Sequence, residues 1–346
     1  MSGLAATFTE EVRAIREAVA LSEPADVALV RIDGEGAYDA VDGLCPIELY
    51  LREGQVRQTL LLDERGRPRA DLYLAADSDG FLLVAEGMAS ADLAALMRER
   101  AGADAVVVDL AETHGVLELN GPFAWEALAA IEGQEVVGFP YLTFYRPTDR
   151  RIYMRAGKTG EYSYDLIVPR EEAPSLRQQI VEVGQELDLR VVGTEAIRHA
   201  QLESWFFDIH REGQEDLTPI ELGLQWRVSF RKEYLGSAAL REHRSRGVRR
   251  RVVPLRSAAK LASGDEITLD DERVGTVLHG ERSVTLGEWI AVALLDAPVW
   301  HSGIDAFRVG GEPARSVSAP FVTQRSLFVN PQRHSYEARA EIPFPP

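Results

Sequence analysis

The 346-residue chain has very little cysteine and no long apolar run. Its single cysteine, Cys45, excludes a disulfide framework, a Cys-x-x-Cys redox pair and a multi-thiolate metal site within one chain. No segment approaches the ~18 uninterrupted apolar residues of a membrane span, and residues 1–20 carry acids where a signal peptide has a basic start. We therefore expect a cytoplasmic protein with no membrane partner.

Positive charge is also scarce. Lysine and arginine number 38 against 55 acidic residues, which gives a net charge of −17 and argues against a nucleic-acid partner. The basic residues nevertheless gather in one place, because eight of them occur between residues 231 and 251. Such a run usually forms a solvated or interdomain face, and the alternative is a surface that binds a polyanion.

The common catalytic signatures are missing as well. The sequence has no Gly-x-Gly-x-x-Gly, no Walker loop, no Gly-x-Ser-x-Gly elbow and no His-Glu-x-x-His. Its seven histidines are scattered, without a pair at a spacing that would converge on a metal, so we expect no metal site. With 45% apolar and 27% charged residues, the composition is that of a folded protein of two or three domains.

The elements that are present mix helices and strands. Thr7 and Glu10 have the spacing of a capping box, which predicts a helix near the N-terminus. Three strand-like segments at residues 56–62, 70–75 and 81–85, joined by turn residues, predict a β-meander. Helices are expected at residues 171–187 and 195–203. Short strands with turns after residue 256 predict a small C-terminal β-barrel.

Four short motifs follow one another in the second half of the chain. Residues 155–161 read Arg-Ala-Gly-Lys-Thr-Gly-Glu, and they are followed by Leu202-Glu203, Thr218-Pro219 and Glu221-x-Gly223-Leu224-x-Trp226. In order and spacing they resemble motifs of the glycine-cleavage T-protein (aminomethyltransferase) superfamily, whose members bind tetrahydrofolate. With the hairpin at residues 54–74 and the landmarks of the C-terminal barrel, the resemblance covers about residues 10–325.

The resemblance implies an α+β fold, a three-part cloverleaf around a central folate channel with a small C-terminal β-barrel. We expect a first folate-binding part at residues 1–140, which contains the hairpin. A second folate-binding part, with the Thr-Gly-Glu block, is expected at residues 141–250. The barrel and tail are expected at residues 251–346.

Site residues also follow from the resemblance. The family places paired acids on the hairpin beside the folate nitrogens, and here Ala70 stands at the first position and Asp71 at the second. Asp71 is therefore the candidate catalytic residue, and the alternative is a surface acid at the end of a hairpin. An acid just past a turn, at the start of a strand with apolar neighbours, is placed to point into a cleft.

Four residues are candidates for binding tetrahydrofolate. Glu161 occupies the family's pterin-binding position, where a carboxylate can accept two parallel hydrogen bonds. Glu203 is the acid of the Leu-Glu motif, and its alternative role is to hold an arginine or backbone groups. Lys158 replaces the family's tyrosine and favours an anionic group, or else points to solvent and pairs with an acid such as Asp165. Trp226 is the last residue of the Glu-x-Gly-Leu-x-Trp motif.

The function expected from the resemblance is tetrahydrofolate-dependent one-carbon transfer, of a methyl group between a small methylated metabolite and N5 of tetrahydrofolate, as in the demethylase branches. Two alternatives remain open, a non-enzymatic folate-binding helper of iron–sulfur cluster assembly and a glycine-cleavage aminomethyltransferase. The small molecule that donates or accepts the one-carbon unit is the expected partner. A carrier protein is not expected, because Lys158 and Gln201 depart from the T-protein motifs.

Overall fold

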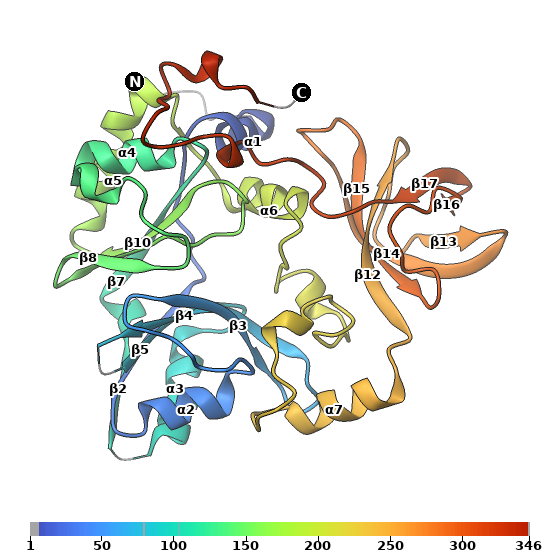
Figure 1. Ribbon diagram of the computed structural model, residues 1–346, viewed down its shortest axis with the longest axis horizontal. Coiled ribbons are helices and arrows are strands. Elements are labelled where there is room, and N and C mark those ends of the chain that lie inside the picture. Colours follow the sequence, from blue (N-terminus) through green and yellow to red (C-terminus); the bar gives the residue numbers. More distant parts are fainter. Residues whose placement is uncertain (1–6, 79, 103, 345–346) are drawn as a thin grey trace.

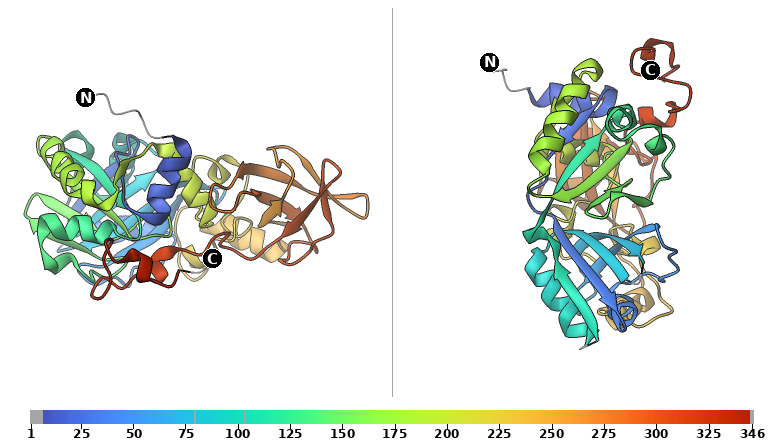
Figure 2. Two further views of the ribbon diagram at one scale, coloured as in Figure 1. Left: turned by 90° about the horizontal axis from the view of Figure 1, so that it is seen from above. Right: turned by 90° about the vertical axis from the view of Figure 1, so that its left-hand side faces the viewer.

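The computed structural model describes residues 7–78, 80–102 and 104–344. It has three parts, a five-stranded sheet, a six-stranded sheet and a closed barrel (Figure 1). Figure 2 shows the barrel projecting to one side of the two sheets. This three-part α+β architecture with a C-terminal barrel confirms the expected fold class.

The first sheet is antiparallel, in the order β3-β4-β5-β2-β6. Its strands are β2 (Ala28–Gly34), β3 (Val56–Leu62), β4 (Pro68–Asp77), β5 (Gly80–Glu86) and β6 (Ala105–Asp109). Helices α2 (Ala37–Leu44) and α3 (Ser90–Ala101) cover one face through residues such as Leu44 and Met97. The meander predicted from the sequence is thus confirmed as β3, β4 and β5.

The second sheet runs in the order β11-β1-β7-β10-β9-β8. Its strands are β1 (Ala20–Ser22), β7 (His114–Asn120), β8 (Phe144–Thr148), β9 (Arg151–Met154), β10 (Ser163–Pro169) and β11 (Arg190–Val191). The helices of this part are α1 (Phe8–Glu17), α4 (Ala124–Glu132), α5 (Ala173–Gly184) and α6 (Thr194–Glu203). Strands β1 and β7 lie within residues 1–140 in sequence, yet both pair in this second sheet.

The two sheets pack face to face. Tyr73 and Val84 of the first sheet share one apolar cluster with Met154 and Ile167 of the second. Strand β4 is buried on both faces for this reason, since its other face packs on the helices. A polar side chain on β4 or β5 that points toward the second sheet is therefore enclosed within the molecule.

The barrel closes in the order β12-β15-β14-β13-β16-β17. Its strands are β12 (Arg250–Ser257), β13 (Glu266–Leu269), β14 (Glu272–Arg282), β15 (Trp289–Asp296), β16 (Phe307–Val309) and β17 (Glu312–Ser316), and α7 (Ser237–Arg246) precedes them. The interior is filled by side chains such as Leu255, Val277 and Phe307. The residues that the structure describes also form seven single-turn helices: η1 (Leu110–Glu112), η2 (Gln134–Val136), η3 (Gln185–Leu187), η4 (Glu212–Gln214), η5 (Gln225–Arg227), η6 (Arg325–Leu327) and η7 (Arg339–Glu341).

After the barrel the chain returns to the second sheet. The C-terminal segment, residues 321–344, runs back past α1 and α4 (Figure 1). Val329, Tyr336 and Ile342 are buried in the same core as Leu119 and Phe123. The C-terminal segment is therefore an integral part of the second part of the fold.

Candidate active site

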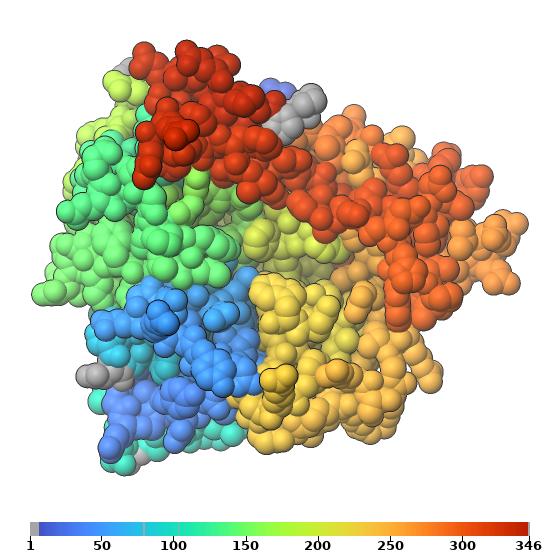
Figure 3. Space-filling model, in the orientation of Figure 1, coloured from blue at the N-terminus to red at the C-terminus, as the bar shows by residue number. Residues whose placement is uncertain are grey.

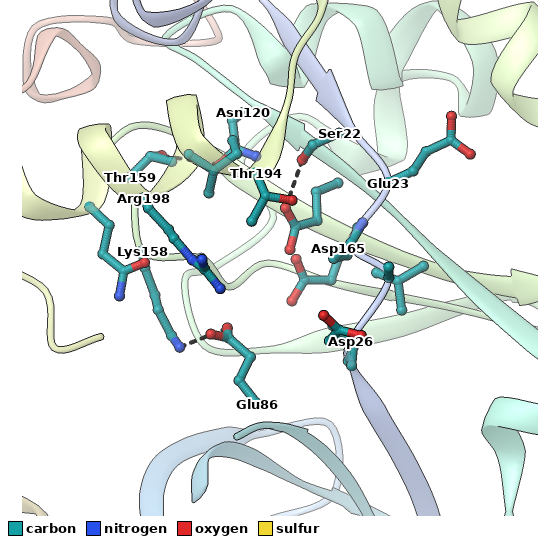
Figure 4. A pocket seen from close by; sticks show the side chains of 18 of the residues that line it. Ser22, Glu23, Asp26, Glu86, Asn120, Lys158, Thr159, Asp165, Thr194 and Arg198 are labelled. Atoms are coloured by element: carbon teal, nitrogen blue, oxygen red, sulfur yellow. Dashed lines mark hydrogen bonds and ion pairs between the residues drawn. The ribbon is translucent and has the colours of Figure 1, made fainter. Parts of the chain in front are cut away.

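The three parts meet around a hollow near the centre of the molecule (Figure 3). A first cavity of about 240 Å³ lies between the two sheets and α6. Its lining includes Asp71, Glu86, Glu118, Lys158, Asp165 and Arg198, several of which are drawn in Figure 4. Most of its charged groups are acidic, so the cavity favours ligand groups that donate hydrogen bonds or carry positive charge.

Asp71 lies at this cavity on β4, opposite Glu86 of β5 in the strand register. The residue is 2% exposed, so it is not the surface acid of the alternative interpretation. Arg227 Nη1 donates to its Oδ1 at 2.8 Å, and Lys158 Nζ lies 3.0 Å from its Oδ2. The lysine is not aligned as a donor, so Oδ2 has no hydrogen-bond partner among the described residues.

Lys158 extends into the cavity from the loop between β9 and β10. It is 7% exposed, and its Nζ donates to Glu86 Oε1 at 2.7 Å (Figure 4). It therefore pairs with Glu86 and Asp71 and does not point to solvent. Burial alone would lower the pKa of Lys158, but the charges of Asp71 and Glu86 outweigh it and raise that pKa above its ordinary value.

The loop that carries Lys158 depends on the glycine before it. Gly157 has a φ of 150°, and a Cβ there would lie 2.2 Å from the Cβ of Ser163. Its backbone N–H donates to the Tyr73 hydroxyl of β4 at 3.2 Å. Only glycine allows this close approach, which fixes the start of the Lys158 side chain over the first sheet.

Two further acids, Glu118 and Asp165, face each other across β7 and β10. The Ser22 hydroxyl donates to Glu118 at 2.7 Å, and the Asp165 carboxylate points into the cavity (Figure 4). Burial raises the pKa of Glu118, and burial with the charges of Glu118 and Glu86 raises the pKa of Asp165. The pair therefore holds protons that an isolated carboxylate would release, and it can donate as well as accept hydrogen bonds.

A second cavity, of about 460 Å³, lies on the Arg227 side of Asp71. Trp226 lines it and is 65% exposed, with the Arg227 guanidinium 4.8 Å from the centre of its ring. Asp71, Lys158 and Trp226 are thus brought together, since Arg227 links the tryptophan to the acid. Arg227, buried at 2% exposure, was missed in the sequence, although it directly follows the Trp226 motif.

Glu161 is placed elsewhere, against the C-terminal segment. Its carboxylate accepts hydrogen bonds from the backbone N–H of Ser326 at 2.8 Å, the Ser326 hydroxyl at 2.7 Å and the backbone N–H of Arg325 at 3.2 Å. Arg16 Nη1 lies 3.5 Å away. Burial raises the pKa of Glu161, while Arg16 and Ser326 oppose the rise. The structure thus gives this carboxylate a set of partners within the chain.

The contacts of Glu161 lead to a prediction about the C-terminal segment. We expect Glu161→Ala to lower the free energy of unfolding by about 2–4 kcal/mol, because three donors lose their acceptor. Trypsin should then cut faster after Arg325 and Arg333, which can be followed by mass spectrometry. Glu182→Ala, at an exposed position on α5, is the control. Unchanged cleavage together with lost tetrahydrofolate binding would instead favour the folate-binding role.

Glu203 is the centre of a buried network at the end of α6. It accepts hydrogen bonds from Arg16 Nε at 2.9 Å, Ser283 Oγ at 2.6 Å and the backbone N–H of Thr285 at 3.0 Å. Burial would raise the pKa of Glu203, but hydrogen bonding with His199 and the charge of Arg16 lower it well below its usual range. Glu203 therefore ties α1 to the barrel, and Arg16 connects it to Glu161.

Comparisons with known proteins agree with this architecture. Two family models match the chain, the GCVT N-terminal domain over residues 2–232 and the glycine cleavage T-protein C-terminal barrel domain over residues 250–323. The chain belongs to the glycine cleavage T-protein family. The expected superfamily is thereby confirmed.

The T-protein relatives include three named aminomethyltransferases. One from Thermotoga petrophila is 25% identical over 84% of this chain and 82% of its own length. One from Corynebacterium aurimucosum is 28% identical over 83% of this chain and 81% of its own. One from Rubrobacter xylanophilus is 28% identical over 91% and 86%. These relatives confirm the expectation of an enzyme of the aminomethyltransferase class.

A solved structure extends the likeness to three dimensions. The glycine cleavage system aminomethyltransferase T from Bartonella henselae matches with a TM-score of 0.81 and 25% identity, over 92% of this chain and 90% of its own. The expectation that a carrier protein is not a partner is wrong, because the relatives are aminomethyltransferases, this one of the glycine cleavage system. Among the described residues, no helix combines the length and apolar character needed to cross a bilayer.

Proposed function

We propose that this T-protein family member is a tetrahydrofolate-dependent aminomethyltransferase, which passes the one-carbon unit of a carrier-bound aminomethyl group to tetrahydrofolate. The names of its relatives favour this alternative over methyl transfer from a small metabolite. The single observation that carries it is the buried Asp71, held by two cations at the cavity between the sheets. Asp71 stands at the position that the resemblance assigns to the chemistry.

The residues of the first cavity suit the pterin ring of tetrahydrofolate. A pterin presents both donors and acceptors along one edge, and a proton-holding pair of carboxyl groups can meet both kinds of group. Glu118 and Asp165 form such a pair. Asp71 Oδ2, which is paired by charge with Lys158 but accepts no aligned hydrogen bond among the described residues, offers a further acceptor. We propose that these three acids hold the ring, and that Lys158 and Trp226 flank the bound molecule. Glu161 and Glu203 remain predicted folate-binding residues. Both contact Arg16, so in this proposal they contribute through the hydrogen-bond network around that arginine.

When bound, tetrahydrofolate supplies the nitrogen that accepts the one-carbon unit. Asp71 contributes a negative charge fixed in a water-poor cavity, where it stabilises positive charge that develops on the reacting groups. Arg227 and Lys158 keep the carboxylate from rotating, so no reorganisation is needed during transfer. The enclosed cavity also brings both reactants to one place, which lowers the entropic cost of their encounter.

The proposal is tested by supplying the donor directly. Purified protein is mixed with tetrahydrofolate and a lipoyl carrier protein loaded with an aminomethyl group, and methylenetetrahydrofolate, 5-methyltetrahydrofolate and ammonia are measured. We expect methylenetetrahydrofolate and ammonia in equal amounts. Parallel reactions contain methylated small molecules in place of the carrier. Formation of 5-methyltetrahydrofolate in those reactions alone would favour methyl transfer, and folate binding without either folate product in any reaction would favour the helper of iron–sulfur cluster assembly.

A further inference from the structure

Two buried side chains with N–H donors line the second cavity. Arg227 and Gln58 are 2% and 6% exposed, and both line this cavity. Arg227 Nε and Gln58 Nε2 have no hydrogen-bond partner among the described residues. Asp71 engages Nη1 of the same guanidinium, so the Nε edge remains for another group.

Buried N–H groups without acceptors are unfavourable, and native proteins rarely contain them outside sites that receive a ligand or water. The charge of Arg227 makes a negatively charged acceptor the best match. Glu212 also lines the cavity, but its carboxyl group accepts a hydrogen bond from the backbone N–H of Asp208 at 2.9 Å, and burial raises its pKa to about 7, so its charge is reduced near neutral pH. The chemistry of the cavity therefore suits a carboxylate.

The walls of the second cavity add a preference for a flat or apolar body. Tyr141, Trp205, Phe207 and Trp226 line it together with Leu222 and Leu224. Aromatic walls around a few converging polar groups are typical of small-molecule sites. A ligand that combines an aromatic ring with a carboxylate would use both features.

An open hollow continues from the second cavity to the surface. The two spaces share the lining residues Arg57, Gln58 and Trp226. The hollow is also lined by Arg231 and Arg244, from the run of basic residues at 231–251, and by one acidic residue, Glu48. Arg244 stacks on Phe230, at 4.5 Å from the ring centre. On a chain with a net charge of −17, these three arginines attract anions to one entrance.

We propose that the second cavity is a carboxylate-binding site, with Arg227 and Gln58 as the recognising donors and the arginine-lined hollow as its entrance. The inference rests on the proposed function, because the cavity ends at the Arg227–Asp71 ion pair. Two molecules of the reaction could supply the carboxylate. One is the glutamate end of tetrahydrofolate, and the other is a small one-carbon donor that is itself an acid.

Ligand-observed NMR titration of the full chain with benzoate and benzamide tests the charge preference. The two probes have nearly the same shape, but only benzoate is anionic. We expect benzoate to bind at least tenfold more tightly than benzamide. Gln58→Leu removes one of the two recognising donors and should weaken benzoate binding at least tenfold, whereas Gln178→Leu, at an exposed position on α5, should leave it unchanged. Arg227→Lys keeps a charge beside Asp71 but lacks Nε, and it provides a second variant should Gln58→Leu fail to fold.

Competition identifies the source of the carboxylate. Displacement of benzoate by p-aminobenzoyl-glutamate would assign the site to the folate tail, and displacement by N-methylglycine would assign it to an acidic donor. Displacement by neither would overturn the proposal. Equal binding of benzoate and benzamide, or a benzoate affinity unchanged in both cavity variants, would overturn it as well. These experiments measure binding and not turnover. Their outcomes can therefore be interpreted even if the aminomethyl-transfer assay gives no product.

Discussion

Asp71→Asn should lower turnover at least ~100-fold and also destabilise the protein. The turnover loss follows from removing the charge that stabilises the transfer, a contribution of about 10²–10⁴ in rate. The stability loss follows because Arg227 and Lys158 lose their shared partner, and breaking a buried ion pair costs about 3–5 kcal/mol. Methylenetetrahydrofolate formation and urea unfolding measure the two effects.

A matched substitution separates the two effects of Asp71→Asn. Asp77 is another buried carboxylate of β4, paired with Arg31 and Arg146 outside the cavity. Asp77→Asn should therefore cost comparable stability while turnover of the folded fraction stays near that of the unaltered protein. If both variants lose turnover in proportion to their loss of stability, the role of Asp71 is structural.

Lys158→Met should destabilise the protein by about 3–5 kcal/mol, because it leaves Asp71 and Glu86 without their shared buried cation. The loss should depend on pH. Lys158 opposes the rise in the pKa values of Glu118 and Asp165, so its removal raises them further. An acid with a raised folded-state pKa contributes most stability below its unfolded pKa and loses it as pH rises through the folded value.

The unfolding free energy of Lys158→Met should therefore fall more steeply between about pH 5 and pH 8 than that of the unaltered protein. Lys232→Met is the control, since Lys232 is also largely buried but pairs with Asp42 and two backbone carbonyls away from this cavity. Urea unfolding over the pH range gives the slopes. If the free energy of unfolding changes with pH equally steeply in the two variants, the proposed interaction of Lys158 with Glu118 and Asp165 is contradicted.

Much of the fold could be predicted because its signals are local. The capping box of Thr7 and Glu10 is present at the start of α1, and the turn residues delimit β3, β4 and β5 as expected. The helix expected at residues 171–187 is confirmed with shifted bounds, as α5 (Ala173–Gly184) followed by the single-turn helix η3 (Gln185–Leu187).

Less of the candidate site could be predicted from the sequence, because the residues that contact one another there lie far apart along the chain. Asp71 and Lys158 were found through short motifs, but Arg227 reaches Asp71 across 156 positions. Glu118 and Asp165 became a pair only through the register of β7 and β10. An acid within an otherwise apolar strand, as in Tyr164 to Val168, was the one signal that could have pointed to Asp165.

The return of the C-terminal segment sets the order in which the chain can fold as it leaves the ribosome. All strands of the first sheet lie between Ala28 and Asp109, so this sheet can form early in synthesis. The second part must wait, since β11 ends at Val191 and Ile342 completes its core. Until residues 325 and 326 emerge, Glu161 lacks the backbone donors that cover it. A stalled or shortened chain would therefore expose an unfinished second part, together with the face of the first sheet that packs against it, which marks the chain for chaperones and proteases.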